Sequence, residues 1–504
     1  MCTLDEIRRH SLPSCALLCA SALFLGLAAC GGASDSDYDP AAACAADAFQ
    51  DPGDSDGDGL SDSEEAQLGT DPRKEDSDGD EVSDFGERGI GTNPLDRQST
   101  LPERDFFVVL PYKKQPQERK LKFSTNIKSA DVYFLIDATA SMAEEIANVR
   151  DTLTNIASAV SQDIPDVQMG VGAFRDFPFA PQGAVVLQQL YGLPSDRPYA
   201  HGLSLTDNLP EVQNFLGSVV ANTGADLPEA QTEALYQVAT GEGGEWSGLA
   251  VTPSLNLVPA TLRLPPANCA AGLRGYACFR QGTTPIVVLV SDAPWHNGPE
   301  GARAYSGITP APHTFDQARD ALVGLGARMV SVVVDGSVDG RSDSEAMLRA
   351  TGSIDAAGNP LVYDAPNGVV SPSIVSGLQA LARETPQEVG TGVANGDNPE
   401  GFDATPFIVS ITPNEGYDAQ GRPGKGYRRK TATKFEGVSP DSTVEFKVEF
   451  QNNIRPHQTK AQIFEVRIDV LGPGGSQLDS RRVFVVVPPC SNPDFKVPGP
   501  GTLI

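Results

Sequence analysis

Residues 131–141 read Asp-Val-Tyr-Phe-Leu-Ile-Asp-Ala-Thr-Ala-Ser, and this stretch decides the fold. Its apolar run is short and continuous, which is typical of a strand buried on both faces of a parallel sheet. Apolar residues then recur at helical spacing from Ile146 to Val160. A buried strand followed by an amphipathic helix is the repeating unit of an α/β fold.

The same alternation continues along the chain. Further buried strands are expected at 169–174, 286–290 and 329–334, and further helices at 228–239, 315–324, 343–350 and 373–384. We therefore predict a doubly wound, mainly parallel sheet over residues 129–388. In such sheets ligands bind beyond the carboxyl ends of the strands.

Oxygen-bearing side chains gather where these strands end. The first strand is followed by Asp137, Thr139 and Ser141, a later strand by Asp292, and Glu229 opens a helix between them. Hard oxygen ligands suit Mg²⁺, and neutral hydroxyls bind it without cancelling its charge, so the ion still attracts an outside carboxylate. Asp137 and Ser141 could instead only cap the next helix. One cap, however, needs one residue and not three.

These residues resemble the metal-ion-dependent adhesion site of von Willebrand factor A domains, whose pattern D-x-S/T-x-S reads here as Asp-Ala-Thr-Ala-Ser. Among these domains the chain is most similar to the I-like domain of integrin β chains. The resemblance implies a von Willebrand factor A-like fold and a Mg²⁺ or Mn²⁺ site made by Asp137, Thr139, Ser141, Glu229 and Asp292.

The same resemblance implies two flanking metal sites. One would use Glu144 and Glu145, and the other Asp176 and Asp226. Gly224 stands where the integrin-like pattern has Asn, which weakens the second. The family's strand-end Asp-Ala-x-x-His is also present and ends in His296, to which we assign no metal.

An acidic twelve-residue motif occurs twice before this region, as DSDGDGLSDSEE from Asp54 and DSDGDEVSDFGE from Asp76. Its spacing matches the oxygen-ligand positions of a calcium loop. The two copies resemble thrombospondin type 3 repeats, although a solvated acidic linker is the alternative. Glu81 stands where the loop expects glycine, so we expect the second loop to bind calcium more weakly or to turn differently. The ligand positions are Asp54, Asp56, Asp58, Leu60, Asp62 and Glu65 in the first copy, and Asp76, Asp78, Asp80, Val82, Asp84 and Glu87 in the second.

The amino-terminal segment is expected to direct export. Its apolar run, residues 15–27, is too short to span a bilayer but suits a signal peptide. The run ends in Leu27-Ala28-Ala29-Cys30, which resembles the lipobox of bacterial lipoproteins. The resemblance implies lipidation of Cys30 and a lipid anchor in the bacterial cell envelope, at the outer membrane or cell surface. An ordinary secretory signal is the alternative.

Four of the 8 cysteines remain once the signal segment and Cys30 are set aside. Cys269 and Cys278 bracket a glycine-rich loop, and we predict a disulfide between them. A pairing of Cys44 with Cys490 follows only by elimination and stays open.

The carboxyl-terminal part reads as a small β-sandwich. Alternating apolar and polar residues predict strands at 444–450 and 464–470, and two further strands are expected at 407–411 and 483–487. A basic cluster between them forms either a solvated hairpin or a ligand patch. Its members are Lys425, Arg428, Arg429, Lys430 and Lys434.

The sequence thus predicts a surface-anchored protein that binds an acidic group of a protein or glycan through a divalent metal. A net charge of −28 excludes a nucleic-acid partner. The alternatives are an envelope scaffold in which metals only rigidify the chain, and a metal-assisted hydrolase; we expect no enzyme, because no catalytic histidine motif is present. The expected segments are a signal peptide (1–29), a flexible acidic linker (30–53), calcium repeats (54–100), a connector (101–128), the α/β domain (129–388), a linker (389–403) and a β-rich domain (404–504).

Overall fold

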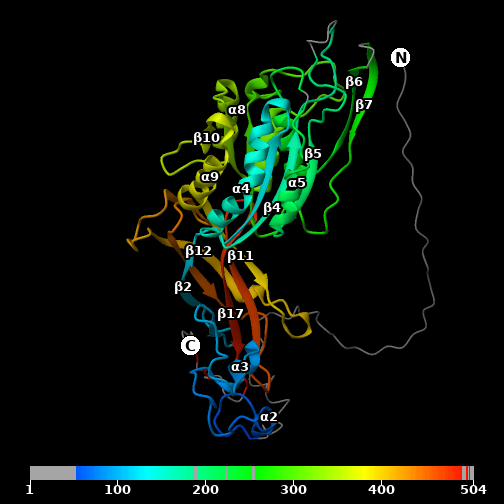
Figure 1. Ribbon diagram of the computed structural model, residues 1–504. Helices are drawn as coiled ribbons and strands as arrows, with labels where there is room; N and C mark the ends of the chain where they lie inside the picture. Colours follow the sequence, from blue (N-terminus) through cyan, green and yellow to red (C-terminus); the bar gives the residue numbers. More distant parts are fainter. Residues whose placement is uncertain are drawn as a thin grey trace, which may run out of the picture.

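The computed structural model describes residues 53–184, 190–222, 224–252, 256–490, 495–497 and 499. The segments expected at 1–29 and 30–53, with Cys30 and Cys44, lie almost entirely outside these ranges. Figure 1 shows three tiers, with the α/β domain at the top, the β domain below it and the calcium repeats at the foot. Within the described ranges, no helix combines the length and hydropathy needed to cross a bilayer.

The α/β domain contains a six-stranded sheet in the order β10-β9-β8-β3-β4-β5. All neighbours are parallel except β5, which runs antiparallel to β4 at the edge. The predicted mainly parallel α/β sheet is therefore present. Its strands are β3 (Ser129–Asp137), β4 (Asp166–Phe174), β5 (Ala200–Thr206), β8 (Thr284–Ser291), β9 (Arg328–Val334) and β10 (Val362–Ala365).

Strand β3 is buried at every position after Ser129. Successive side chains point to opposite faces, so this sheet is covered on both faces. Helix α4 packs against α5 and α9, α6 packs against α7, and α7 against α8. A hairpin of β6 (Gly244–Val251) and β7 (Leu257–Leu264) adds to the domain. The helices are α4 (Ala143–Ser161), α5 (Leu209–Leu216), α6 (Gln231–Thr240), α7 (Phe315–Leu325), α8 (Val338–Ala350) and α9 (Ser371–Glu384).

The β domain consists of two sheets, in the orders β1-β17-β16-β11-β14-β13 and β12-β15-β2. The tail is β-rich, as expected, and the predicted strands fall in β12, β15, β16 and β17, except that Phe407 lies just before β12. The bounds are β1 (Phe106–Val109), β2 (Gln117–Ser124), β11 (Gln387–Asn395), β12 (Ile408–Tyr417), β13 (Arg429–Lys430), β14 (Phe435–Val438), β15 (Thr443–Phe450), β16 (Gln462–Leu471) and β17 (Gln477–Val487).

Two segments expected to be connections are strands of this β domain. The region 101–128 contributes β1, parallel to β17, and β2, antiparallel to β15. The first part of the expected linker 389–403, up to Asn395, belongs to β11, which lies between β16 and β14. Its glycines read as a linker, but Gly392 lies where a Cβ would approach Leu471 Cδ1 to 3.0 Å. The α/β domain is thus inserted into the β domain, between β2 and β11.

The calcium repeats are docked onto the β domain. Short helices α2 (Asp62–Leu68) and α3 (Asp84–Ile90) follow the two loops. Leu60, Val82 and Phe85 are buried in a separate apolar cluster with Phe484 of β17 and Phe495. The repeats are therefore packed against the foot of the β domain in addition to preceding it in the chain.

Candidate metal-binding sites

Asp137 lies at the carboxyl end of β3 and is fully buried. Its Oδ1 accepts hydrogen bonds from the Thr139 backbone N–H at 3.0 Å and from Thr139 Oγ1 at 2.7 Å. Thr139 Oγ1 lies 3.3 Å from Ser141 Oγ. The carboxylate and both hydroxyls of the motif therefore share one edge of the sheet. The helix-cap alternative is not what the structure shows, because no side chain caps α4 or the turn before it.

The end of β8 supplies the neighbouring groups. Ser291 Oγ donates to Asp137 Oδ2 at 2.8 Å and fixes the carboxylate from its other side. Burial, with a contribution from the nearby negative charge of Asp292, raises the pKa of Asp137 to about 6. Ser291 is a positioning residue that the motif does not contain. Its place directly before Asp292 is the only sequence signal for it.

Glu229 reaches the same edge from the loop before α6. Its backbone N–H donates to the Pro294 carbonyl at 3.0 Å, and His296 N–H donates to the Glu229 carbonyl at 2.8 Å. The Glu229 side chain is buried, and its Oε2 has no hydrogen-bond partner. Burial and then the charges of Asp176 and Asp137 raise the pKa of Glu229 far above its ordinary range. No basic side chain among the described residues forms an ion pair with the Glu229 carboxylate.

Asp176 and Asp226, expected at one flanking site, lie together with His296. His296 Nε2 is 3.1 Å from Asp226 Oδ2 and 3.3 Å from Asp176 Oδ2. His296 Nδ1 is 2.6 Å from the Arg303 carbonyl, which can only accept, so Nδ1 carries a proton. In the neutral ring Nε2 is then the free ligand atom. The residue to which we assigned no metal is thus part of this cluster.

Glu144 and Glu145, expected at the other flanking site, differ in burial. Glu145 is buried and its Oε2 has no hydrogen-bond partner, whereas Glu144 is exposed. Burial, followed by the charges of Asp292 and Asp335, raises the pKa of Glu145. Glu145 therefore feels the charges of the metal edge, while Glu144 stands in solvent.

The two calcium loops share one hydrogen-bond framework. Gly57 and Gly59 N–H groups donate to the two oxygens of Asp54, at 2.7 and 3.1 Å. In the second loop Gly79 and Glu81 donate in the same way to Asp76, at 2.7 and 2.8 Å. Glu81 has φ 82°, in the same left-handed region as Gly59 at φ 106°. The second loop therefore does not turn differently, because Glu81 accepts a strained conformation that glycine adopts freely.

The glutamates at the last ligand position of each loop, Glu65 and Glu87, are the carboxylates that most need a cation. Glu65 and Glu87 are fully buried, and neither oxygen of either carboxylate has a hydrogen-bond partner. Burial raises the pKa of both to about 7, to which acidic neighbours contribute. The carboxylates of Asp54, Asp56 and Asp58 meet within 4.8 Å, as do those of Asp76, Asp78 and Asp80. The Asp58 carboxylate also joins the loops, because it accepts the Phe85 N–H at 2.8 Å.

The residues present fit divalent cations by the chemistry of their donors. Hydroxyl and carboxylate oxygens gather at the sheet edge and in the loops. Asp137, Glu229, Glu65 and Glu87 are buried there without a basic ion-pair partner among the described residues, whereas buried Asp176 has His296 beside it. Such charges are costly unless a cation balances them. A bound divalent ion would supply that positive charge and an electrophilic centre for an acidic group.

The predicted Cys269–Cys278 disulfide is present, with Cα atoms 5.4 Å apart. Cys490 is disulfide-bonded as well. Cys44, its candidate partner, lies outside the described residues.

Comparison with known proteins identifies the class of these regions. Residues 127–246 match the family described as the integrin beta chain VWA domain, and residues 54–74 match the bacterial TSP3 repeat. The resemblance to these two families, expected from the sequence, is confirmed. Together with the acidic clusters, it supports divalent-metal binding and a role in metal-dependent adhesion or binding.

The integrin relatives are distant, and this chain spans only a small part of their length. Human integrin beta-4 is 30% identical over 113 residues, which is 22% of this chain and 6% of that protein. Integrin beta-6 of Rattus norvegicus is 24% identical over 117 residues, 22% of this chain and 15% of that protein. A solved von Willebrand factor type A protein from Catenulispora acidiphila is 10% identical and covers 78% of this chain and 74% of its own, with a TM-score of 0.31. The strand order β10-β9-β8-β3-β4-β5 defines the fold of the α/β domain.

Proposed function

We propose that this protein is a surface-anchored binding protein that recognises an acidic group of a protein or glycan through a divalent metal. Mg²⁺ or Mn²⁺ would be held by Asp137, Thr139, Ser141, Glu229 and Asp292, and Ca²⁺ by the two acidic loops. The observation that carries the proposal is the Glu229 carboxylate, which is buried beside Asp137 with one oxygen unpartnered. A divalent cation bound at this edge would balance these charges.

The placement of the site supports recognition of an external partner. Strand β3 begins next to the β domain and ends at Asp137, so nine residues at about 3.3 Å each carry the site away from the junction. The calcium repeats lie at the opposite end of the molecule (Figure 1). A lipid at Cys30, which precedes the repeats in the chain, would hold the repeats toward the membrane and present the metal edge outward.

The test measures binding of the purified full chain to immobilised acidic peptides and acidic glycans, with amidated or neutral counterparts as controls. We expect binding in Mg²⁺ or Mn²⁺ that disappears in EDTA and in Asp137→Ala. The matched control is Asp151→Ala, an exposed carboxylate of α4, which should bind normally. Equal binding in EDTA and by Asp137→Ala would show that the metal does not mediate recognition.

The scaffold alternative gains support from the packing of the repeats against the β domain. It predicts that divalent ions change thermal stability but never ligand binding, which the same experiment separates. We propose no enzymatic role. Turnover of an ester, peptide or phosphate substrate that is lost in Asp292→Asn would contradict this.

A further inference from the structure

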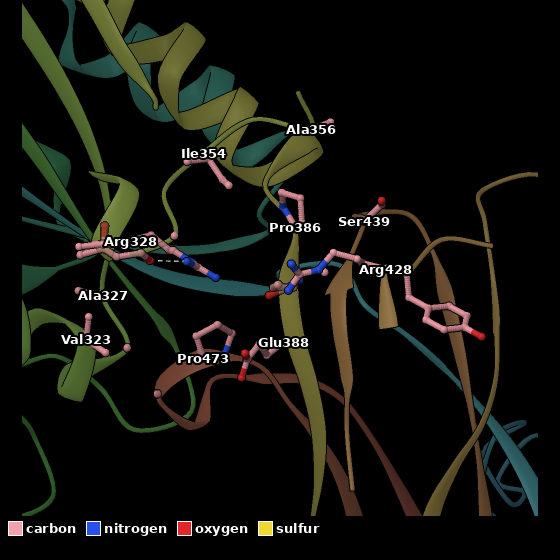
Figure 2. A pocket seen from close by; sticks show the side chains of 18 of the residues that line it. Val323, Ala327, Arg328, Ile354, Ala356, Pro386, Glu388, Arg428, Ser439 and Pro473 are labelled. Carbon is pink, nitrogen blue, oxygen red and sulfur yellow. Dashed lines mark hydrogen bonds between the residues drawn. The ribbon is translucent and has the colours of Figure 1, made fainter. Parts of the chain in front are cut away.

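A cavity of about 840 Å³ lies between the α/β domain and the β domain. Its walls include Arg328 at the start of β9, the loop after α8, Glu388 of β11 and Arg428 next to β13 (Figure 2). Because β9 is parallel to β8, and β8 to β3, Arg328 lies at the opposite edge of the sheet from Asp137. The cavity is therefore separate from the metal edge.

Arg328 is a buried cation without an acidic ion-pair partner among the described residues. Arg328 is 8% exposed, and its Nη1 donates to the Thr351 carbonyl. A Cβ at Gly352 would come within 2.5 Å of Nη1, so the glycine makes room for the guanidinium. Burial lowers the pKa of Arg328 to about 10, which leaves it charged at neutral pH. A guanidinium has five N–H donors, and one carbonyl cannot satisfy them.

Arg428 faces Arg328 from the β domain. Figure 2 shows the two guanidinium groups extending toward each other across the cavity. The side chain of Arg428 is 78% exposed, and its Nη2 is 3.8 Å from Glu436 Oε2, an oxygen that Arg429 already binds at 2.6 Å. Arg428 belongs to the basic cluster for which the sequence left a hairpin and a ligand patch open. Arg328 and Arg428 thus bring two positive charges together in a chain of net charge −28, and such a pair favours binding of an anion.

An acidic residue in the cavity wall, Glu388, limits which anions could bind there. Glu388 lines the wall, and its Oε2 is engaged by Lys434 Nζ at 2.5 Å instead of by Arg328. A carboxylate beside the arginines disfavours a dianion such as phosphate, but it accepts hydrogen bonds from hydroxyl groups. The volume lies within the range of about 300–1,000 Å³ typical of small-molecule sites.

We propose that this interdomain cavity binds a sugar acid, with the ligand carboxylate between Arg328 and Arg428 and its hydroxyl groups toward Glu388. The planar guanidinium fork matches a carboxylate, and one arginine from each domain would make the ligand a bridge between them. This binding needs no metal. It stands independently of recognition at the metal edge.

The test is calorimetric titration of the purified full chain with glucuronate and galacturonate, with glucose, galactose and inorganic phosphate as separate arms. We expect saturable binding of the sugar acids alone, unchanged in EDTA. Arg428→Gln should weaken it at least about tenfold, the loss expected for one charge-assisted contact. Because Arg428 is exposed, this variant keeps the fold. The matched control is Arg422→Gln, an exposed arginine paired with Asp418 outside the cavity, which should bind normally.

Arg328→Lys tests the buried partner. Lysine keeps the charge but loses the planar fork, so binding should weaken while circular dichroism and the melting temperature show a folded chain. Equal binding of neutral sugars, preference for phosphate, unchanged affinity in Arg428→Gln or no saturable binding of either acid would each overturn the proposal.

Discussion

The two ends of strand β3 each carry a fully buried aspartate, and the two are treated in opposite ways. Asp131 accepts Arg280 Nε at 2.7 Å, the Arg280 backbone N–H at 2.6 Å and Thr283 Oγ1 at 2.9 Å. Asp137, six residues on, has only backbone and hydroxyl donors and faces Asp292 and Glu229. Arg280 balances the charge of Asp131, whereas no basic side chain among the described residues balances that of Asp137, as the proposed metal site requires. Burial of an acid therefore indicates function here only where the balancing charge is missing.

The largest expected effect separates these two aspartates. Asp137→Asn should weaken Mn²⁺ binding at the metal edge by about 100-fold or more, because a neutral amide replaces a charged ligand. It should not destabilise the metal-free chain, since the substitution removes a carboxylate whose buried charge is unfavourable above about pH 6. Titration followed by the Mn²⁺ electron paramagnetic resonance signal measures the affinity.

Asp131→Asn is the matched variant on the same strand. It should leave Mn²⁺ affinity unchanged but lower the free energy of unfolding by about 3 kcal/mol, because Arg280 loses its buried partner. If both variants lost Mn²⁺ equally, or if neither did, the contrast between the two ends of β3 would not hold.

Glu65 and Glu87 of the calcium loops are, like Asp137, buried carboxylates without a basic partner among the described residues. In Glu65→Gln together with Glu87→Gln, the rise in melting temperature that Ca²⁺ produces should largely disappear, because each loop loses a charged ligand. In EDTA the double variant should melt above the unmodified chain, since it no longer buries two carboxylates without partners. Differential scanning calorimetry with Ca²⁺ and with EDTA measures both.

The control is Glu64→Gln, because Glu64 is paired with Arg88 and Lys460 and is no loop ligand. It should keep the calcium response. A double variant that still gained the full stabilisation from Ca²⁺ would show that the ion binds elsewhere.

The sequence patterns predicted the elements whose contacts lie close together along the chain. The run from Asp131 to Ser141 carried the central strand and the hydroxyl motif, and the spacing from Ile146 to Val160 carried α4. The β domain was harder, because its pairings are distant in sequence: Phe106 of β1 pairs with Val483 of β17. The short apolar β1 and the charged β2 have no pattern that reveals such a partner.

The site shows the same limit. The motif predicted Asp137, Thr139 and Ser141 because they lie within five residues of one another. His296 was set aside, since its contacts with Asp176 and Asp226 come from three separate loops that only the folded chain brings together. Whether a buried carboxylate has a cation beside it, the property that separates Asp131 from Asp137, depends on such distant contacts.

The smallest expected effect concerns Asp479 of the β domain, a buried acid that, like Asp131, has basic partners. Asp479 is 3% exposed and accepts Arg104 and Lys128, the latter at 2.8 Å. Burial alone would raise its pKa, but the hydrogen bonds from Arg104 and Lys128 outweigh burial and hold the pKa of Asp479 below its ordinary value. A depressed carboxyl pKa stabilises the folded state above about pH 4, and this contribution is lost as the pH falls through the folded-state value.

Asp479→Asn should therefore lower the free energy of unfolding by about 1–2 kcal/mol at neutral pH, a modest loss because both basic partners are half exposed. The difference from the unmodified chain should shrink as the pH is lowered below about 4. Urea unfolding followed at several pH values in excess Ca²⁺ measures it, with Asp397→Asn, an exposed acid without a basic partner among the described residues, as control. A difference that stayed constant down to pH 3 would mean that Asp479 acts through shape and hydrogen bonding alone, and that its charge is not what Arg104 and Lys128 balance.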